Sequence, residues 1–537
     1  MTSLPSSHAA HPPTGALRTN SVGYVANAAK RATVVGRPSG SFVLRREGDG
    51  TGAFRGSLIA AEGDGVADFS ELTEVGRFCL DVAGVGRSVV FPIGPDAYVE
   101  PYRAAMLAFY AWRSGVDISF CYQGQHFFHA AGHLGGALLD LVGHPGAVKD
   151  VTGGWYDAGD YGKYIVNSAA AMGPLLQAWE DFRPALEVTR IEVPETGGDL
   201  PGYLAELRFQ LDWMLKLQFE DGSVAHKLSP LDFPPFVVPA RDALPYYLSD
   251  WGSAATAGFA ATMAKASRTF ERYDLPYAST LRSAALRAYA FLRNNPADHQ
   301  PDPSRYVHQQ YATDDGHLRI WAAAEIWETT GRVEALADFE ARIAAFGHRV
   351  VANMDWASQS NFGVFTYLRS RQSGRSPAAV AALTRALLDT ANTVVERANS
   401  RWGRGNDGYF WGSNGAVALV CTTLRVAHAL TGDTRYLDAA AHQLAYLLGR
   451  NEYGRSQVTG VGIDPPRYPH DRRSSADGID APYPGYLVGG ASREGNWEDV
   501  EDSYETNEVA INWQAALVYA LAGFLPVPAP CSVARRE

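Results

Sequence analysis

The distribution of apolar and polar residues changes near residue 100. Before that point, short segments alternate apolar with polar residues or are rich in β-branched residues, which is typical of strands. The strands that this pattern predicts are RATVVG at 31–36, SFVLRRE at 41–47, RFCLDV at 77–82 and RSVVFPIG at 87–94, with glycine-rich turns between them. About 80 residues of this kind predict a small β-sandwich.

Beyond residue 100, apolar residues recur at i, i+3, i+4 and i+7, the period of an amphipathic helix. This period predicts eleven long helices, at 101–114, 162–182, 200–219, 253–272, 276–295, 317–331, 333–346, 377–399, 414–431, 435–449 and 505–524. Six antiparallel hairpins contain twelve helices, one more than the predicted number. We therefore expect a closed ring of helical hairpins with a site in the loops at one end. A helical solenoid would have a similar count, but no repeat of about 30–50 residues is visible.

The length of the chain, 537 residues, exceeds the size at which one hydrophobic core stops growing. We therefore expect a leader at 1–17, the sandwich at 18–97, a helical domain at 98–527 and a tail at 528–537. The net charge is −11 and Lys and Arg form no cluster, which argues against nucleic acid or an anionic membrane as a partner and favours a neutral one. The sequence has no run of about 18 apolar residues, so no transmembrane helix is predicted.

Two further features bear on location and on metals. The N-terminus has neither the basic nor the apolar region of a signal peptide, which predicts a cytoplasmic protein, or a secreted one if a signal was trimmed. The four cysteines are scattered and form no C-x-x-C pair, so neither a zinc motif nor a redox motif is visible.

The stretch GGWYDAGDYGKY, residues 153–164, combines two aspartates with four aromatic rings. Asp160 directly precedes a predicted helix, so one interpretation is an N-cap. Capping leaves Asp157 and the rings of Trp155 and Tyr156 unexplained. Aromatic faces stack on sugar rings and carboxylates bind sugar hydroxyls, so the stretch also fits a carbohydrate site.

A second acidic cluster, at 496–523, leads into the last predicted helix. Most of its acids fit a helix N-terminus, where negative charge complements the macrodipole. Glu508 differs because it lies between Tyr504 and Trp513 and precedes apolar residues, which should raise its pKa by disfavouring the ionised form. A protonated acid in one segment and ionised aspartates in another would suit glycoside hydrolysis. The loop at 454–478, rich in prolines, is either a solvated connection or part of the site.

Together these segments resemble glycoside hydrolase family 9, the cellulase family with an (α/α)6 barrel, in its subgroup with an N-terminal immunoglobulin-like domain. The resemblance covers nearly the whole chain, through LRTNSVGYVANAAKRATVVG at 17–36, ELRFQLDWMLKLQFEDGSVAHKLS at 206–229, YFWGSNGAVAL at 409–419 and YLLGRNEYGRSQVTG at 446–460. Its specific motifs are Ser456-x-Val458-Thr459-x2-Gly462, Pro469-His470-x-Arg472 and Trp497-x-Asp499-x4-Tyr504-x3-Glu508-x-Ala510.

The resemblance implies a role for each candidate residue. Asp160 would be the general base, Asp157 would help to hold the attacking water, and Glu508 would be the general acid. His470 and Arg472 would bind the sugar next to the scissile bond. The rings expected to contact the substrate are Trp155, Tyr156, Tyr504 and Trp513.

Members of the family bind calcium or zinc, but this sequence lacks most of the residues that bind them. Family members often bind calcium through an Asp-Glu pair, and this chain has His317 and Leu318 at that position. Many members of the subgroup hold zinc with two Cys, a His and an Asp. Here Ser114 and Gly132 stand in place of the cysteines, and only His133 matches. We therefore predict no metal and no cofactor.

The leading prediction is an inverting hydrolase that cleaves the β-1,4-glucosidic bonds of cellulose-type glucans or cello-oligosaccharides in the manner of an endoglucanase. Other members of the subgroup act from chain ends, so an exo-acting β-glucosidase, a cellobiohydrolase-like enzyme or an exo-β-glucosaminidase remains an alternative. A sugar-binding protein without catalysis is a third possibility. It is disfavoured because Asp160 and Glu508 are both present in their motifs.

Overall fold

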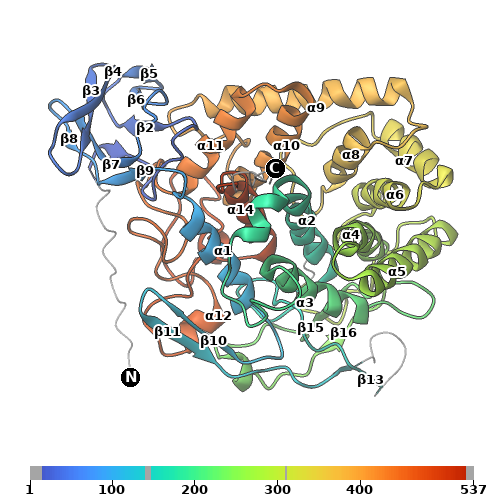
Figure 1. Ribbon diagram of the computed structural model, residues 1–537. Coiled ribbons are helices and arrows are strands. Elements are labelled where there is room, and N and C mark those ends of the chain that lie inside the picture. Colours follow the sequence, from blue (N-terminus) through green and yellow to red (C-terminus); the bar gives the residue numbers. More distant parts are fainter. Residues whose placement is uncertain (1–14, 139–146, 309–310, 528–537) are drawn as a thin grey trace, which may run out of the picture.

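The computed structural model describes residues 15–138, 147–308 and 311–527, in which a β-sandwich lies against a larger helical domain (Figure 1). Residues 1–14 of the expected leader and the expected tail at 528–537 lie outside the described residues. Leu17, the last residue of the expected leader, belongs to the first strand. The boundary expected between 97 and 98 falls between the last strand of the sandwich, which ends at Ile93, and the first helix, which begins at Val99.

Two antiparallel sheets form the sandwich. One has the order β1 (Leu17–Arg18), β2 (Arg31–Val34), β6 (Asp64–Asp68), β5 (Ile59–Ala61). The other has the order β4 (Gly52–Ser57), β3 (Ser41–Arg46), β7 (Gly76–Val82), β8 (Gly86–Arg87), with β9 (Phe91–Ile93) also paired to β7. The predicted strands correspond to β2, β3, β7, and to β8 with β9. The sequence pattern missed β1, β4, β5 and β6. Neither β4 nor β5 fully buries a residue, so neither shows an apolar alternation.

Fourteen α-helices lie in the described part of the chain. They are α1 (Val99–Ala111), α2 (Ile165–Val188), α3 (Gly202–Lys216), α4 (Ser253–Phe270), α5 (Leu275–Asn294), α6 (Gly316–Thr330), α7 (Val333–Ala345), α8 (Ser360–Arg369), α9 (Pro377–Ala398), α10 (Ser413–Thr431), α11 (Arg435–Leu447), α12 (Arg472–Ala476), α13 (Tyr504–Asn507) and α14 (Ile511–Ala522). Ten of the predicted segments match α1 to α7 and α9 to α11. The eleventh, 505–524, is divided between α13 and α14.

The one long helix that the sequence pattern missed is α8. Nine of its ten residues, Ser360 to Leu368, are buried, so no polar face alternates with an apolar one. A helix that is buried all round carries no amphipathic period. With α8, the long helices number twelve in the described residues, enough for six hairpins.

The long helices form an inner and an outer layer. The inner helices α2, α4, α6 and α8 pack in succession, and α14 packs against both α2 and α10. Outside them, α5 packs on α4, α7 on α6, α1 on α14, and α9 and α11 on α10. This arrangement is consistent with an (α/α)6 barrel, and in Figure 1 the inner helices surround the centre of the helical domain.

Short strands cover one end of the inner helices. The sheet there has the order β13 (Val148–Lys149), β12 (Ala137–Leu138), β16 (Tyr247–Leu248), β15 (Lys227–Ser229), β14 (Lys163–Tyr164). A hairpin of β10 (Ile118–Tyr122) and β11 (Gln125–His129) lies nearby. These strands and α12 gather on the lower side of Figure 1, and α2 begins directly after β14.

A buried arginine attaches the sandwich to the helical domain. Arg450 donates from Nε to Thr33 Oγ1 (3.1 Å) and from Nη2 to the carbonyl of Arg401 (3.0 Å). Burial lowers the pKa of Arg450 to about 10. The N–H of Ser21 donates to the carbonyl of Leu448 (2.9 Å), just beyond α11. The sandwich therefore supports the point from which the 454–478 loop departs.

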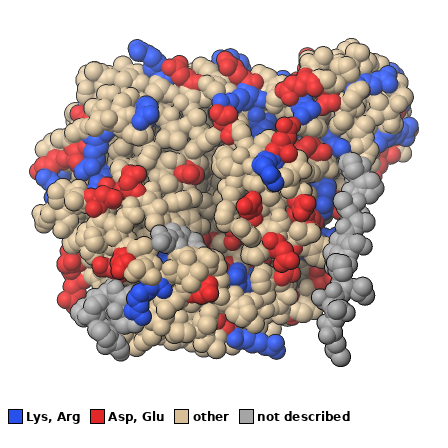
Figure 2. All heavy atoms as spheres, turned by 180° about the vertical axis from the view of Figure 1, so that it is seen from behind, with Lys and Arg blue, Asp and Glu red and all other residues tan. Residues whose placement is uncertain are grey.

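The surface and the helices also bear on the nature of the partner. Among the described residues, none of the helices combines the length and apolar character needed to cross a membrane. On the face shown in Figure 2, basic and acidic side chains are interspersed rather than gathered by sign. The neutral partner therefore remains a prediction from the sequence.

Candidate active site

A cleft of about 1030 Å³ lies where α2, α8, α10 and α14 begin. Its walls include Tyr164, Gln359, Gly412 and Ala510, the residues that immediately precede those four helices. Seven of the nine predicted site residues line this cleft: Asp157, Asp160, His470, Arg472, Tyr504, Glu508 and Trp513. Residues from distant parts of the sequence thus meet in one hollow.

The other two predicted residues, Trp155 and Tyr156, lie outside the cleft lining and correct our expectation. Both are only 1% exposed. Trp155 donates from Nε1 to Glu206 (2.8 Å), and the hydroxyl of Tyr156 contacts His133 Nδ1 (2.7 Å). These rings are packed in the core behind the aspartate loop, where they support it instead of facing a sugar.

The loop that carries the two aspartates is fixed through its backbone carbonyls. The carbonyl of Asp157 accepts from the N–H of Ile511 (2.9 Å), and that of Ala158 from Arg473 Nη2 (2.6 Å). Gly159 is required here, because a Cβ at this position would lie 2.0 Å from the carbonyl oxygen of His470. The loop is therefore held against the first residues of α14 and against the 470–473 segment.

Asp157 is fully buried and held by two side chains. Asn167 Nδ2 donates to its Oδ1 (2.8 Å), and the hydroxyl of Tyr311 donates to its Oδ2 (2.7 Å). Burial, and secondarily the charge of Asp160, raise the pKa of Asp157 to about 8, against the lowering effect of these hydrogen bonds. Burial and the neighbouring carboxyl group therefore both favour the protonated form of Asp157.

Asp160 is not a helix cap. The helix predicted to begin at 162 begins at Ile165, after the short strand β14, and its N-cap residue is Tyr164. Asp160 instead accepts a hydrogen bond from the N–H of Gly162 (3.2 Å) and lines the cleft with 6% of its surface exposed. The capping interpretation fails because the backbone pairs with β15 before it turns into the helix.

Glu508 lies in an interruption of the helix that the sequence pattern predicted. Its backbone is extended (φ −70°, ψ 159°), between the end of α13 and the start of α14. The residue forms a parallel bridge with His470, and its carbonyl accepts from the N–H of Gly489 (2.8 Å). Pairing with these two loops competes with helical hydrogen bonds and holds the carboxyl at the cleft.

The environment of Glu508 favours its protonated form. Burial raises its pKa well above the usual value, and the charges of Asp160 and Asp157 raise it further. The guanidinium of Arg472 and a hydrogen bond from the Trp411 side chain oppose this shift. The cleft therefore holds, on the α14 side, a carboxyl group whose protonated form is favoured and, on the α2 side, the two aspartates.

His470 and Arg472 join the walls of the cleft. His470 Nδ1 contacts the carbonyl of Glu501 (2.7 Å), and burial lowers the pKa of this histidine, so that Nδ1 is the donor and Nε2 keeps a lone pair. Arg472 donates from Nε to the carbonyl of Pro234 (2.8 Å) and from Nη1 to that of Gly159 (3.1 Å). Arg472 thus ties the aspartate loop to the opposite wall.

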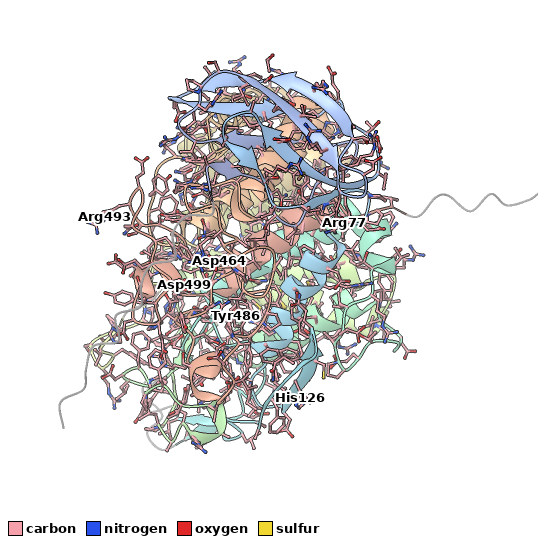
Figure 3. All side chains as sticks on the ribbon, turned by 90° about the vertical axis from the view of Figure 1, so that its left-hand side faces the viewer. Arg77, His126, Asp464, Tyr486, Arg493 and Asp499 are labelled. Carbon is pink, nitrogen blue, oxygen red and sulfur yellow. The ribbon has the colours of Figure 1, made fainter. Side chains whose placement is uncertain are left out.

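Asp499, which precedes Glu508 in the sequence, holds the backbone of the 467–470 segment. It forms an ion pair with Arg455 (2.8 Å), which also pairs with Asp464 (2.9 Å). Its Oδ1 accepts from the N–H groups of Arg467 and Tyr468, both at 3.0 Å. Figure 3 shows Asp464 and Asp499 close together below the sandwich. The stretch between Trp497 and Glu508 therefore contains a carboxyl group that positions the 467–470 segment.

Several other cleft residues were not predicted. Tyr311 holds Asp157 and has a left-handed backbone (φ 61°), and neither property has a signal in the sequence. Trp411 lies between Phe410 and Gly412 in YFWGSNGAVAL, and this mixture of rings and glycine is a signal that the sequence does carry. The structure shows Trp411 to be half exposed. The other aromatic cleft residues that were not predicted are Tyr164, Phe233, Trp356, Phe362 and Phe410.

The side chains near the expected zinc position do not fit that metal. A Cβ at Gly132 would lie 2.3 Å from the backbone of Pro239, so a cysteine has no room there. Ser114 Oγ accepts from the ammonium group of Lys163 (3.4 Å). His133 Nε2 pairs with Asp242 (3.0 Å). A direct His–Asp pair and a buried lysine thus fill the place of a metal.

The position expected for calcium is equally unsuited. His317 Nδ1 hydrogen-bonds Ser360 Oγ (2.9 Å) and its ring contacts Phe346, while Leu318 is fully buried. An imidazole and an aliphatic side chain do not replace the carboxylate oxygens that calcium requires. In the part of the chain that the structure describes, no three His, Cys, Asp or Glu side chains gather so as to hold a metal ion.

Chelation should therefore leave the protein unchanged. We expect EDTA treatment to alter neither the hydrolytic activity predicted from the sequence nor Tm, because the residues at both candidate positions are satisfied by protein partners. The measurement is activity and thermal unfolding before and after dialysis against EDTA, with and without added Zn²⁺ or Ca²⁺. A fall in Tm on chelation that the added metal reverses would contradict this prediction.

Comparison with known proteins gives a consistent result over the whole chain. The family model described as glycosyl hydrolase family 9 matches residues 98–521, and that of the cellulase N-terminal ig-like domain matches residues 13–87. Endoglucanase D of Acetivibrio thermocellus is 43% identical over 526 residues, which cover 96% of this chain and 84% of that protein. The xyloglucan-specific endo-β-1,4-glucanase of Bacteroides ovatus is 34% identical, covering 97% and 95% of the two chains.

The fold is shared with solved structures as well. A metagenome-derived glycoside hydrolase family 9 endoglucanase superposes with a TM-score of 0.87 at 33% identity, over 95% of this chain and 98% of that one. The family match, the helical fold and the two carboxylate segments in one cleft all lead to the same assignment. This chain belongs to glycoside hydrolase family 9, with an N-terminal immunoglobulin-like domain.

Proposed function

We propose that the protein is an inverting endo-β-1,4-glucanase. The observation that carries this proposal is the cleft that brings a protonated acid, Glu508, together with the aspartates 157 and 160. An inverting hydrolase needs such a pair, with carboxyl groups about 6.5–9.5 Å apart to leave room for a water. Its chemistry requires no cofactor.

Glu508 is the general acid in this mechanism. Its raised pKa keeps the proton available at neutral pH, and it donates this proton to the glycosidic oxygen as the bond to the anomeric carbon breaks. The neighbouring carboxyl groups of Asp160 and, less strongly, Asp157 support this shift.

Asp160 is the general base. It takes a proton from a water that attacks the anomeric carbon on the face opposite to the leaving group, so the product has the inverted anomeric configuration. Asp157 receives hydrogen bonds from Asn167 and Tyr311, and this fixed group orients the same water. His470 and Arg472 bind the sugar beside the scissile bond.

Two separate pairs of rings that line the cleft support action within a glucan chain. The rings of Trp411 and Tyr504 lie 5.4 Å apart, and each residue is about half exposed. Phe233 stacks on His308 at 4.1 Å. Sugar rings stack on such faces, so the two pairs would hold more than one glucose unit of a bound chain. An enzyme that acts from chain ends needs only one open side.

We also infer that the twelve long helices close into an (α/α)6 barrel. The succession α2, α4, α6, α8 and the contacts of α14 with α2 and α10 support a ring, and the remaining helices lie outside it. In such a barrel, the loops before the inner helices converge at one end, as the cleft residues do here.

The product profile on defined oligomers tests this function. We expect cellopentaose to give mixed short products, whose newly formed reducing ends are α-anomers when observed by NMR before mutarotation. Release of glucose alone would mean action from a chain end, and release of glucosamine from chitosan oligomers would mean a different substrate. A β-anomer as the first product would rule out inversion.

A further inference from the structure

Glu452 is an acidic residue beside the cleft to which the proposed reaction gives no role. It follows α11, is partly buried and is not one of the residues that line the cleft. Its Oε1 accepts from the hydroxyl of Tyr409 (3.0 Å) and, at the longer distance of 3.5 Å, from that of Tyr446. A hydrogen bond is stronger where water is excluded, so the contact with Tyr409 fixes the position of that ring.

Arg404 holds the same tyrosine through its ring face. The guanidinium carbon lies 3.6 Å from the centre of the Tyr409 ring. Arg404 Nη2 also donates to the carbonyl of Gly408 (2.5 Å), the residue before the tyrosine. Asp407, one residue earlier, exchanges two hydrogen bonds of 2.9 Å with the side chain of Asn353. The hydroxyl, the ring and the preceding backbone of Tyr409 are therefore all held.

Tyr409 comes just before the part of the chain that reaches the cleft. Trp411 and Gly412 line the cleft, whereas Tyr409 does not. Gly412 is a fixed point on the other side of Trp411, because its φ is 83° and a Cβ there would lie 2.4 Å from the Trp513 ring. Between these two fixed points, the half-exposed ring of Trp411 lies 5.4 Å from that of Tyr504. The two rings form an aromatic platform in the cleft.

We propose that Glu452 is a positioning residue for the platform of Trp411 and Tyr504, and that it sets the affinity for a glucan chain that lies on this platform. The inference rests on the proposed function. A stacking surface binds a sugar best when its orientation is fixed beforehand, because ordering a side chain on binding costs part of the affinity. Glu452 supplies this order through Tyr409.

Three substitutions test the contact. Glu452→Met and Tyr409→Phe each remove the hydrogen bond, whereas Glu452→Gln keeps an acceptor at Oε1. The measurements are KM and kcat on cellopentaose, and the Kd of cellopentaose by calorimetry with Asp160→Ala added to slow cleavage. We expect KM and Kd to rise roughly 3–10-fold in the Met and Phe variants, the scale of one aromatic contact, while kcat stays within about twofold. Glu452→Gln should keep most of the wild-type affinity.

Tyr446→Phe is the matched control. It removes the second hydroxyl near Glu452, but Tyr446 belongs to α11 and not to the segment that reaches the cleft. The Kd of cellopentaose should therefore stay at the wild-type value, whatever the change in Tm. A rise as large as that of Tyr409→Phe would mean that any disturbance around Glu452 weakens binding, and the proposal would fail.

The last comparison uses Trp411→Ala, which removes half of the platform. In this background Glu452→Met should raise Kd no further, because Glu452 acts on the sugar only through Trp411. An additional rise, or a loss of kcat in Glu452→Met with an unchanged Kd, would overturn the proposal. An unchanged Kd in Trp411→Ala alone would instead count against the platform in the proposed function. A raised Kd in Trp411→Ala together with wild-type affinity in Glu452→Met would overturn this inference alone.

Discussion

The Glu508→Gln variant is expected to lose about 10²–10⁴-fold of kcat on cellopentaose, the usual contribution of a general acid. It should keep far more of its rate on an aryl glycoside such as a dinitrophenyl cellobioside, whose leaving group departs without a proton. The alkaline limb of the rate profile should disappear, because that limb reports the loss of the proton that burial and the two aspartates retain on Glu508. The measurement is kcat on both substrates across pH.

The same variant should be more stable than the wild type at neutral pH. Because the folded state raises the pKa of Glu508, the unfolded chain releases this proton first as the pH rises above about 4.3. The folded state then binds more protons than the unfolded one, and the free energy of unfolding falls with rising pH. A neutral Gln escapes this loss, so its Tm should exceed the wild-type value at pH 7 and approach it near pH 4.

A neighbouring acid provides the control. Glu505 lies in α13, is exposed and has no place in the cleft lining, so Glu505→Gln should leave the rates and the profile unchanged. Equal losses of Glu508→Gln on natural and activated substrates would mean that Glu508 binds the sugar without donating a proton. An alkaline limb that persists near pH 8 in Glu508→Gln would assign that limb to Asp157.

The second large effect is expected at the base. Asp160→Ala should reduce kcat by about 10²–10⁴-fold on every substrate, activated or not, because attack by water needs the base even when the leaving group does not need the acid. Added azide should restore part of the rate on a dinitrophenyl cellobioside, since this anion needs no deprotonation and fits the space left by the carboxylate. The product should be the α-glycosyl azide, which NMR identifies.

Asp150→Asn is the matched control for the base. Asp150 precedes the same loop, is exposed and bonds Thr152, so its replacement should leave turnover intact. Activity of Asp160→Ala within a few-fold of wild type would place the base elsewhere. A β-glycosyl azide would contradict attack from the inverting face.

The sequence predicted the carboxylates but not the orientation of the rings beside them. Asp157, Asp160 and Glu508 lie in motifs with fixed spacing, and their chemistry is legible from residue type. Whether Trp155 faces a sugar or the core depends on Glu206, a partner about fifty positions away that the local pattern does not reveal. Aromatic residues near a site serve packing as readily as binding, and only their partners distinguish the two.

The two errors in helix boundaries beside the cleft have a common physical origin. The predicted helix at 505–524 is interrupted because Glu508 and Val509 pair with the segments at 470 and 488, so tertiary hydrogen bonds replace local ones. The helix predicted from 162 begins later because Lys163 and Tyr164 pair with β15. The departures from periodicity therefore fall where the chain builds the cleft, and regular helices elsewhere follow their apolar pattern closely.

The hydrogen bond from the N–H of Ile511 to the carbonyl of Asp157 has a consequence for biosynthesis. The base and the acid are separated by roughly 350 positions, and a ribosome adding about 5–20 residues per second needs roughly 20–70 s to pass from one to the other. Until α14 packs between α2 and α10, a nascent chain has the loop of the proposed base but lacks the segment of the proposed acid in its place. If the proposed roles hold, a chain that ends before Glu508 is therefore expected to be inactive.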